Sequence, residues 1–462
     1  MLRLYDSLTH DVRELELRDA NRVSMYTCGP TVYDLPHLGH GRYTLVWDAV
    51  RRWLSYNGLE VDFVSNITDI DDNIINRAAR EGKTEAEVAA EYEQHWWDAM
   101  DAIGVARPTH IPHATQYVAE MVELIDKLIA DDVAYRTSDG VYLDVSKVEG
   151  YGGLAGQSLE SLQVGARIEA NLEKRSPFDF ALWKAAKPGD PTWPAPFGDG
   201  RPGWHTECVV MSLGLLGPDF DLHVGGQDLR FPHHENERAQ AIAAHTPFAR
   251  RWAHSGWVMV GEEKMSKSLG NFTSLTDMIA KTDARAYRLL VLRSHYRSPI
   301  EVSAATIDDA ERGLARLDSL ARRFDVPTTW SDFARRPDGL SPRAHELDAA
   351  VTLLLDDDFN TPQALALIFE AVSEANATAD RGEQSDAESL ALACTYLLAG
   401  MGLNLRRAES TIDEESQSLA RERDAARAAK DFARSDALRD ELVNKGWIVE
   451  DTAAGTSLRR AL

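Results

Sequence analysis

The sequence predicts an α/β protein whose core is interrupted by an insertion and followed by helical segments. Residues 23–67 read as strand, loop, helix and strand, and an alternating strand and helix pattern returns after residue 200. After Asn271 the pattern is helical. With 462 residues, of which 44% are hydrophobic, the chain is long enough for more than one domain with sizeable cores.

The first of these units, residues 23–67, predicts a ligand site. Val23 to Cys28 alternates apolar and small polar side chains, as a short strand does, and Gly29-Pro30 ends it. Apolar residues recur at helical spacing from Arg42, and Val61 to Ile67 reads as the second strand. In such units the ligand lies beyond the carboxyl ends of the strands.

The segment His37-Leu38-Gly39-His40 falls on the start of the predicted helix. Helix N-termini bind anions. Gly39 leaves room for a nucleotide against the backbone, while His37 and His40, three residues apart, can face one way and donate to phosphate oxygens. The alternative is that the two histidines only cap the helix.

An acidic stretch follows the second strand. Thr68 and Asp69 are expected to project into the same crevice as Cys28, because they lie at the carboxyl end of a neighbouring strand. The aspartates of this stretch suit a metal site, but the favoured interpretation makes them the capped, dipole-matched start of the helix that carries Ile74 and Ala78.

A candidate pair of metal ligands lies in the second half of the core. Residues 220–226 read as a strand and turn, and Pro232 predicts the start of a helix that runs to Ala244. His233 and Glu237 are four apart and project from one face, which allows both to reach one metal ion. His234 is expected to point roughly 100° away. Taken alone, the pair also fits two ordinary residues at a helix start.

Composition indicates in which cellular compartment the protein works and which kinds of partner it can have. The three cysteines, Cys28, Cys208 and Cys394, argue against a disulfide framework and leave metal binding or catalysis open. No apolar run reaches the length of a membrane span, and the amino terminus lacks the apolar core of a signal peptide. These observations predict a soluble cytoplasmic protein without a membrane partner.

The net charge argues against a nucleic-acid partner unless a local basic face exists. The chain carries 50 basic and 74 acidic residues, a formal net charge of -24. A local face is sufficient to hold phosphates if the acidic residues lie elsewhere. The candidates are the residues Arg285, Arg288, Arg293 and Arg297, at near-helical spacing, and the later run Arg421 to Arg439.

Two motifs resemble those of a known enzyme family. His37-Leu38-Gly39-His40 resembles the first signature of class I aminoacyl-tRNA synthetases, usually written HIGH, with Leu38 in place of isoleucine. The second signature, KMSKS, is present without departure as residues 264–268. The chain further resembles cysteinyl-tRNA synthetases over nearly its whole length. The matching positions are Cys28 in Tyr-Thr-Cys-Gly, Cys208 in Trp-His-Thr-Glu-Cys, and His233 and Glu237 in His-His-Glu-Asn-Glu.

This resemblance implies a function and a set of site residues. Cys28, Cys208, His233 and Glu237 would bind one zinc ion per chain, a mixture of ligands that suits that metal. The resemblance implies catalytic roles for His37, His40, Lys264 and Lys267, ATP binding by Gly39, His40 and Lys267 with Mg²⁺, and cysteine binding by Gly29, Thr68, Trp204 and Asp228. The partners would be tRNA-Cys, L-cysteine and ATP, and the protein is expected to be a monomer.

The resemblance also implies a division into domains. A Rossmann-like catalytic core would comprise residues 1–113 and 200–250, joined by a connective insertion at 114–199. Residues 251–300 would carry the KMSKS loop and a stem-contact region. A helical bundle for the tRNA anticodon stem would follow at 301–405, and a small C-terminal anticodon-recognition domain at 419–462.

Three alternatives remain at this point. A cysteine ligase of low-molecular-weight thiol (mycothiol) synthesis shares the adenylating core, but that family is generally shorter and lacks the C-terminal module. A catalytically silent tRNA-binding paralogue would have no need of the intact signature lysines and histidines. An adenylyltransferase of smaller metabolites shares the histidine signature but does not explain the two cysteines.

Overall fold

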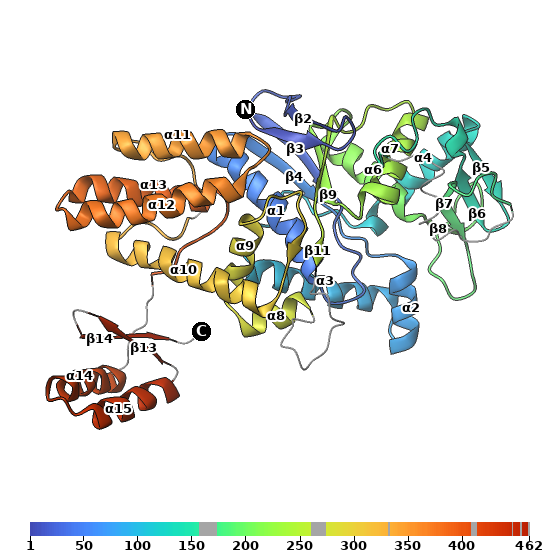
Figure 1. The fold of residues 1–462 in the computed structure, drawn as a ribbon. Coiled ribbons are helices and arrows are strands. Elements are labelled where there is room, and N and C mark those ends of the chain that lie inside the picture. The colour runs from blue at the N-terminus through green and yellow to red at the C-terminus, as the bar shows by residue number, and fades with distance from the viewer. Residues whose placement is uncertain are drawn as a thin grey trace.

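The computed structural model describes residues 1–156, 173–259, 274–330, 333–407, 414–445, 447–452 and 455–460. Its centre is a parallel sheet of four strands in the order β10-β9-β3-β4 (Figure 1). The strands are β3 (Arg22–Thr27), β4 (Glu60–Ser65), β9 (Leu222–Gly226) and β10 (Arg251–Ser255). The predicted α/β core is therefore confirmed.

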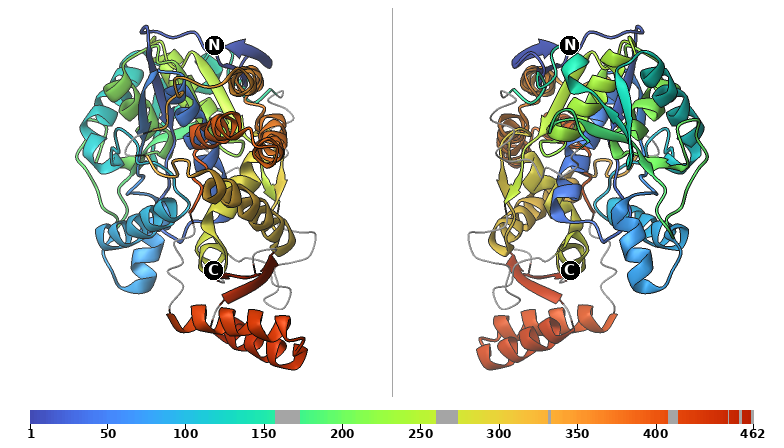
Figure 2. Two further views of the ribbon diagram at one scale, coloured as in Figure 1. Left: turned by 90° about the vertical axis from the view of Figure 1, so that its left-hand side faces the viewer. Right: turned by 90° about the vertical axis from the view of Figure 1, so that its right-hand side faces the viewer.

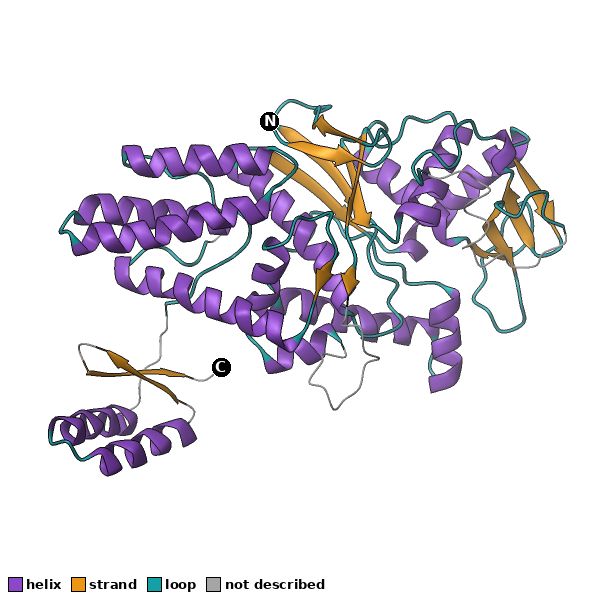
Figure 3. Cartoon of the chain, in the orientation of Figure 1, coloured by secondary structure: helices purple, strands orange, loops and turns teal. Residues whose placement is uncertain are grey.

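Helices cover this sheet (Figure 3). α1 (Leu38–Tyr56) connects β3 to β4, and α7 (Glu235–Ala243) connects β9 to β10. α1 contacts β4, β9 and β10, while α6 (Trp204–Leu216) contacts β3 and β4. β9 is buried along its whole length, as a covered parallel strand should be. Because the chain leaves β3 and β9 toward opposite edges, a crevice opens at their carboxyl ends.

The remaining core elements frame this sheet. A hairpin of β1 (Arg3–Asp6) and β2 (Asp11–Glu14) precedes β3, and α2 (Asp72–Glu81) and α3 (Glu85–Ala102) follow β4. The predicted capped helix after the acidic stretch is α2, since the Asp71 side chain accepts from Asn73 N.

The insertion between the two halves of the core carries its own antiparallel sheet, of order β5-β6-β7-β8. It consists of a 3-10 turn at Ala114–Tyr117, α4 (Val118–Ala130), β5 (Ala134–Thr137), β6 (Gly140–Leu143), a 3-10 turn at Val145–Lys147, β7 (Phe180–Ala185) and β8 (Gly200–Pro202). β8 pairs with β7, so the insertion ends after Pro202 and the predicted boundary at Asp199 is wrong by three residues.

A second boundary also needs correction. The predicted core ended at residue 250, but β10 at Arg251–Ser255 pairs with β9 along five residues and belongs to the core sheet. The prediction that strands stop after Asn271 is wrong at β12 (Ile300–Glu301), which pairs with β11 (Val258–Met259), and at two strands near the end of the chain, residues 447–452 and 455–460. A two-residue strand leaves too little sequence pattern to detect.

Apart from β12, the described residues from Leu275 to Gly400 form helices joined by loops, as predicted. The helices are α8 (Leu275–Lys281), α9 (Ala284–Leu292), α10 (Ala304–Phe324), α11 (Pro342–Asp356), α12 (Thr361–Asp380) and α13 (Gln384–Gly400). One hydrophobic cluster runs from the core sheet into this bundle and includes Met25, Val50, Leu289, Val351 and Leu397. The bundle is therefore packed against the helices and strands of the core sheet.

A small unit ends the chain and stands apart from the bundle in both side views (Figure 2). It contains α14 (Glu414–Ala428), α15 (Phe432–Asn444) and an antiparallel pair of β13 (Trp447–Thr452) and β14 (Gly455–Arg460). Its own core includes Leu438, Leu442 and Trp447. Because α14 begins at Glu414, the unit starts five residues before the predicted boundary at 419.

The four arginines proposed as a basic face at residues 285–297 form ion pairs with aspartates instead. Arg285 pairs with Asp283 and Asp318, Arg288 with Asp48, Arg293 with Asp309, and Arg297 with Asp358. Arg288 is also buried. Most of these aspartates lie in other helices or loops, so the ion pairs could not be predicted from the spacing of the arginines in the sequence. In the part of the chain that the structure describes, no helix is long and apolar enough to cross a membrane.

Candidate active site

A cavity of about 540 Å³ lies in the crevice at the carboxyl ends of β3 and β9. Most of the predicted site residues line it, namely Cys28, Gly29, His37, Gly39, His40, Trp204 and Asp228. Thr68 is not among the residues that line the cavity, and its buried hydroxyl donates to Glu207 Oε2 (2.8 Å). Lys264 and Lys267 lie outside the described residues.

His37 and His40 cap α1 through each other. The backbone N–H of His40 donates to His37 Nδ1 (3.2 Å), and that of His37 donates to His40 Nδ1 (3.3 Å). Their rings stack with centroids 3.6 Å apart. Because each Nδ1 accepts a hydrogen bond, the ring proton of each neutral imidazole lies on Nε2. The two histidines therefore cap the helix, as the alternative interpretation expected. Their rings are also stacked, so they face the same way.

Burial keeps both rings neutral. It lowers the pKa of His37, although Asp228 opposes this shift. Burial, together with the neighbouring His37, lowers the pKa of His40 to about 3. The pair thus offers two neutral N–H donors beside the cavity, and it does not carry positive charge at neutral pH.

Gly29 brings the end of β3 against the segment after β4. A side chain here is impossible without movement, because a Cβ atom would lie 1.6 Å from the Asn66 carbonyl oxygen. Gly29 N and the Tyr26 hydroxyl both donate to Asn66 Oδ1, at 2.9 and 3.1 Å. The close approach holds Cys28 at the edge of the cavity.

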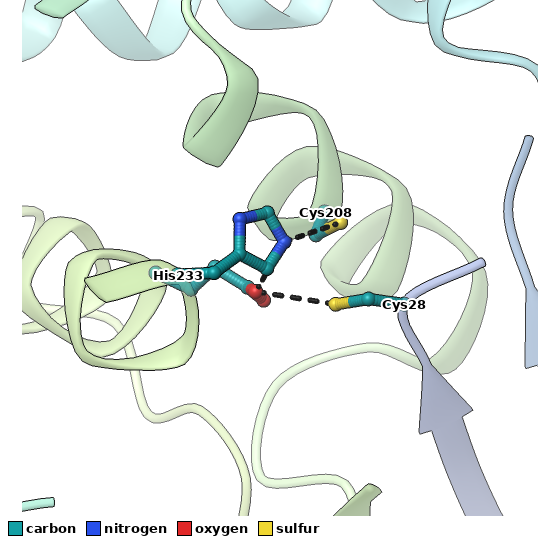
Figure 4. A group of neighbouring side chains, drawn as sticks. Cys28, Cys208 and His233 are labelled. Carbon is teal, nitrogen blue, oxygen red and sulfur yellow. Dashed lines mark hydrogen bonds and ion pairs between the residues drawn. The ribbon is translucent and has the colours of Figure 1, made fainter. Parts of the chain in front are cut away.

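The four predicted metal ligands converge from three separate segments of the chain. Cys28 follows β3, Cys208 lies on α6, His233 lies in the π-helical turn Arg230–His234 that leads into α7, and Glu237 lies in the first turn of α7. Figure 4 shows the two thiols and the imidazole turned toward one centre. Glu237 Oε1 lies 3.3 Å from Cys28 Sγ and 3.1 Å from His233 Nε2, which is 3.5 Å from Cys208 Sγ. All four ligand atoms lie within 4.8 Å of one another and the residues are buried.

A second arrangement of four ligands shares part of this cluster. Cys28, His223, His234 and Glu237 also have ligand atoms within 4.8 Å. His234 was expected to point away from His233, but its Nε2 lies 3.4 Å from Cys28 Sγ, so its ring reaches the same cluster. Sequence reasoning missed His223 and His234 as cluster members. The available signal was a histidine inside the apolar strand of residues 220–226, where an imidazole needs a buried polar partner.

The donor chemistry of the first group fits a zinc ion better. It supplies two sulfurs, one imidazole and one carboxylate, whereas the second supplies a single sulfur. Burial raises the pKa of Cys28 and raises that of Cys208 to about 11, so a cation is needed to hold both as thiolates. The ring centroids of Trp204 and His233 lie 4.2 Å apart. Because Trp204 lines the cavity, the first group of ligands lies beside the cavity.

Two aspartates of the acidic stretch after β4 bind other parts of the chain and so stabilise the fold. Asp69 accepts from Thr115 N (2.9 Å), so the expectation that it projects into the crevice is wrong. Asp72 pairs with Lys184 and Arg201 of the insertion. These partners lie more than 40 residues away in the sequence, which is why local patterns did not reveal them.

A buried histidine beside the cluster predicts acid sensitivity. Burial, with His223 and Arg230 nearby, lowers the pKa of His254 well below its ordinary value. The folded state keeps this ring neutral while the unfolded chain takes up a proton below about pH 6.5. The free energy of unfolding is therefore unaffected by His254 above that pH and decreases as the pH drops. At pH 5.5 the loss from this residue is about 1.4 kcal/mol.

The measurement is the free energy of unfolding in urea at pH 7.5 and 5.5. His254→Gln removes the titrating ring and should reduce the difference between the two values by about 1.4 kcal/mol. The same change at the exposed His345 of α11 is the control. An unchanged difference in His254→Gln would contradict the assignment.

Comparisons with known proteins identify the family. Residues 14–312 match the family described as tRNA synthetases class I (C) catalytic domain, and residues 350–405 match the DALR domain. The chain is 43% identical to a cysteine–tRNA ligase of Chromobacterium violaceum and 44% identical to one of Laribacter hongkongensis, with 100% of each chain covered in both cases.

The fold has a solved counterpart. Mycobacterium tuberculosis methionyl-tRNA synthetase, in complex with methionyl-adenylate, superposes with a TM-score of 0.61 at 16% identity, over 82% of this chain and 90% of that one. This likeness concerns the fold, whereas the two sequence comparisons concern the family. The chain belongs to the cysteine–tRNA ligase family of class I aminoacyl-tRNA synthetases.

Proposed function

We propose that this protein attaches L-cysteine to tRNA-Cys in two steps within the crevice. The cysteine carboxylate attacks the α-phosphate of ATP in line and expels pyrophosphate, which leaves cysteinyl-adenylate. The 2′-hydroxyl of the terminal adenosine of the tRNA then attacks the cysteinyl carbonyl and releases AMP. The observation that carries this proposal is the cluster of two thiols, an imidazole and a carboxylate beside a cavity lined by His37, Gly39 and His40.

The adenylating step depends on positioning and on stabilising phosphate charge. His37 and His40 would donate neutral Nε2–H groups to phosphate oxygens, because their Nδ1 atoms accept from the backbone. Since these rings are neutral, the positive charge would come from Lys264 and Lys267, with Mg²⁺ on the ATP. Gly39, in the cavity wall, would let the nucleotide approach the backbone.

The amino-acid end would be held by residues that surround the metal cluster. Gly29, Trp204 and Asp228 line the cavity, and Asp228 supplies a carboxylate for the α-ammonium group. Thr68 donates its hydroxyl proton to Glu207, which leaves its oxygen lone pairs to accept from that ammonium group. Glu207 thereby orients Thr68, a role that sequence reasoning did not assign.

Cys28, Cys208, His233 and Glu237 would hold zinc, which supplies a soft Lewis acid for the thiolate of the substrate. This chemistry supports discrimination against serine. An apolar pocket rejects a close isostere by no more than about a hundredfold. A serine hydroxyl is far less readily deprotonated than a thiol and is a poorer partner for a site rich in sulfur.

The full-length match supports transfer to tRNA over the ligase of thiol synthesis. The curated relatives cover 100% of the chain, which includes the C-terminal unit after Glu414. We propose that this unit and the α10–α13 bundle bind tRNA, while the protein acts as a cytoplasmic monomer.

Pyrophosphate exchange with each amino acid, followed by charging of total tRNA, tests the function. Exchange should depend on cysteine, and the charged product should be tRNA-Cys. Truncation at Glu409 should leave the exchange rate within about twofold of wild type, because the removed unit holds no adenylating residue. It should lower kcat/KM for charging by about a hundredfold or more, because the unit is proposed to bind tRNA. Exchange without charging by the full chain would instead support the thiol ligase, and equal loss of both reactions in a folded truncation would contradict the role of the unit.

A further inference from the structure

Arg42 is a buried arginine of α1 that forms no ion pair with any of the described residues. It lies two positions after His40 and is 1% exposed. Its guanidinium group donates to three main-chain carbonyl oxygens, from Nη1 to that of Trp257 and from Nη2 to those of Tyr296 (3.2 Å) and Ser298. Burial lowers the pKa of Arg42 to about 10, so the group stays charged at neutral pH. Burying a charge without a carboxylate partner costs free energy, so a neutral side chain would suit a site of packing alone better.

The three carbonyl groups belong to two paired segments at the active-site cavity. Residues 255–258, the wall segment, line the cavity and run into β11. Residues 296–298, the partner segment, precede β12. Main-chain hydrogen bonds join the two segments, among them the bond from Gly256 N to the Tyr296 oxygen (2.8 Å). Arg42 adds a second donor to that oxygen and also reaches the wall segment, so it bridges the two.

Side-chain packing does little to hold the wall segment. Trp257 is 50% exposed, Met259 is 53% exposed, and β11 pairs with β12 over two residues only. The partner segment is anchored more firmly, because Tyr296 is buried and its hydroxyl donates to Asp358 Oδ1 (2.7 Å). The position of the wall segment therefore depends on main-chain hydrogen bonds, including the bond that Arg42 donates.

Gly256 allows the two segments to approach closely. A Cβ atom there would lie 2.5 Å from the Arg297 carbonyl oxygen and 2.7 Å from that of Ser298. The glycine permits the short distance between the segments, and the guanidinium group of Arg42 holds them at it.

We propose that Arg42 is a positioning residue for the nucleotide, which holds the wall segment at the distance from the start of α1 that ATP and cysteinyl-adenylate require. His37, Gly39 and His40 at the start of α1 line the same cavity as the wall segment, and α1 contacts β11. The planar guanidinium fork reaches carbonyl oxygens of both segments at once, which a side-chain amide cannot do. A wall that is already fixed need not be ordered when the nucleotide binds. This inference rests on the proposed function.

The test is cysteine-dependent pyrophosphate exchange at varied ATP and at varied cysteine. Arg42→Met should raise KM for ATP about tenfold, with kcat and KM for cysteine within about threefold of wild type, because only the nucleotide loses part of its support. Zinc content should be unchanged, since the metal cluster is not altered. Arg42→Lys keeps the charge but lacks the planar fork, so its KM for ATP should lie between those of Arg42→Met and wild type.

Chemical rescue separates the positioning role from a loss of stability. In Arg42→Ala the deleted side chain leaves room for a small cation. Methylguanidinium, at a concentration that does not unfold the protein, should lower KM for ATP toward the wild-type value. Methylammonium, which carries the same charge without the fork, should have a smaller effect.

Gly256→Ala is an independent probe of the same distance. Its Cβ atom would push the wall segment away from residues 297–298 while Arg42 stays intact. KM for ATP should again rise, by about threefold or more, and KM for cysteine should change less.

Arg52→Gln is the matched control. Arg52 also lies on α1, but its guanidinium group pairs with Asp48 (2.8 Å), and the described residues that line the cavity do not include it. Its loss should leave KM for ATP unchanged.

An unchanged KM for ATP in folded Arg42→Met, or an equal rise in Arg52→Gln, would overturn the role of Arg42. If Arg42→Met does not fold, Arg42→Lys and Gly256→Ala decide the question, and a wild-type KM for ATP in both would overturn it. Absence of cysteine-dependent exchange in the wild-type protein would instead refute the proposed function.

Discussion

Cys208→Ala is expected to abolish cysteine activation and to remove the bound metal. The loss in kcat/KM for cysteine should be at least about a thousandfold, or about 4 kcal/mol of transition-state stabilisation. Cys208 Sγ lies 3.5 Å from His233 Nε2 in the candidate zinc cluster, and three remaining ligands hold the ion weakly. His233→Ala should have the same effect. Metal analysis of the purified variants and pyrophosphate exchange are the measurements.

Cys394→Ala provides a matched control for the loss of a buried thiol. Cys394 is fully buried in α13 of the bundle, outside the cluster, so its removal should leave zinc content and exchange unchanged. Zinc should be present in stoichiometric amount in the wild-type protein. Active protein without zinc, or a zinc-free variant that still rejects serine, would show that the metal does not determine specificity.

The same experiment distinguishes the two overlapping groups of ligands. Loss of zinc in Cys208→Ala places the ion in the group with two sulfurs. Retention of zinc in Cys208→Ala, with loss in His234→Ala, would place it in the group with Cys28, His223, His234 and Glu237.

Lys267→Ala should lower kcat of pyrophosphate exchange by about a hundred- to a thousandfold, with less than about a threefold change in KM for cysteine. The reason is that the lysine ammonium group would act on pyrophosphate as it departs, so its effect is confined to the transition state. The neutral imidazoles of His37 and His40 cannot replace that charge.

The control for this variant is Lys281→Ala. Lys281 lies on α8, is 57% exposed, and pairs with Asp277 (2.6 Å), so its loss should leave exchange intact. Measurement of exchange at saturating ATP and varied cysteine separates kcat from KM. A normal kcat in Lys267→Ala would exclude the residue from the adenylating step.

Elements with strong local signals were predicted closely. The helical region expected after Asn271 includes α10 (Ala304–Phe324), which Ser303 caps and in which apolar residues recur at helical spacing. The helix after the acidic stretch was also predicted from its caps, and Asp71 performs that role in α2.

Elements whose membership depends on a partner strand were misplaced. β10 joins the core sheet only because Arg251–Ser255 pairs with β9, and β8 joins the insertion only because Gly200–Pro202 pairs with β7. Strand pairing depends on residues far apart in the sequence, so the sequence of a short strand does not predict which sheet the strand joins.

The sequence by itself determined the α/β core, the largely helical second half, the motif at His37 to His40 and the His233–Glu237 pair. The resemblance to a known family was needed to join that pair with Cys28 and Cys208 as one ligand set. Periodicity, caps and short motifs are local properties, so they can be read without contacts. Only the tertiary structure decided that His223 and His234 join the metal cluster, that Asp69 turns away from the crevice, and that distant aspartates neutralise Arg285 and Arg288. Each of these depends on side chains brought together from distant parts of the chain, and charge and burial at such a site are set by those neighbours.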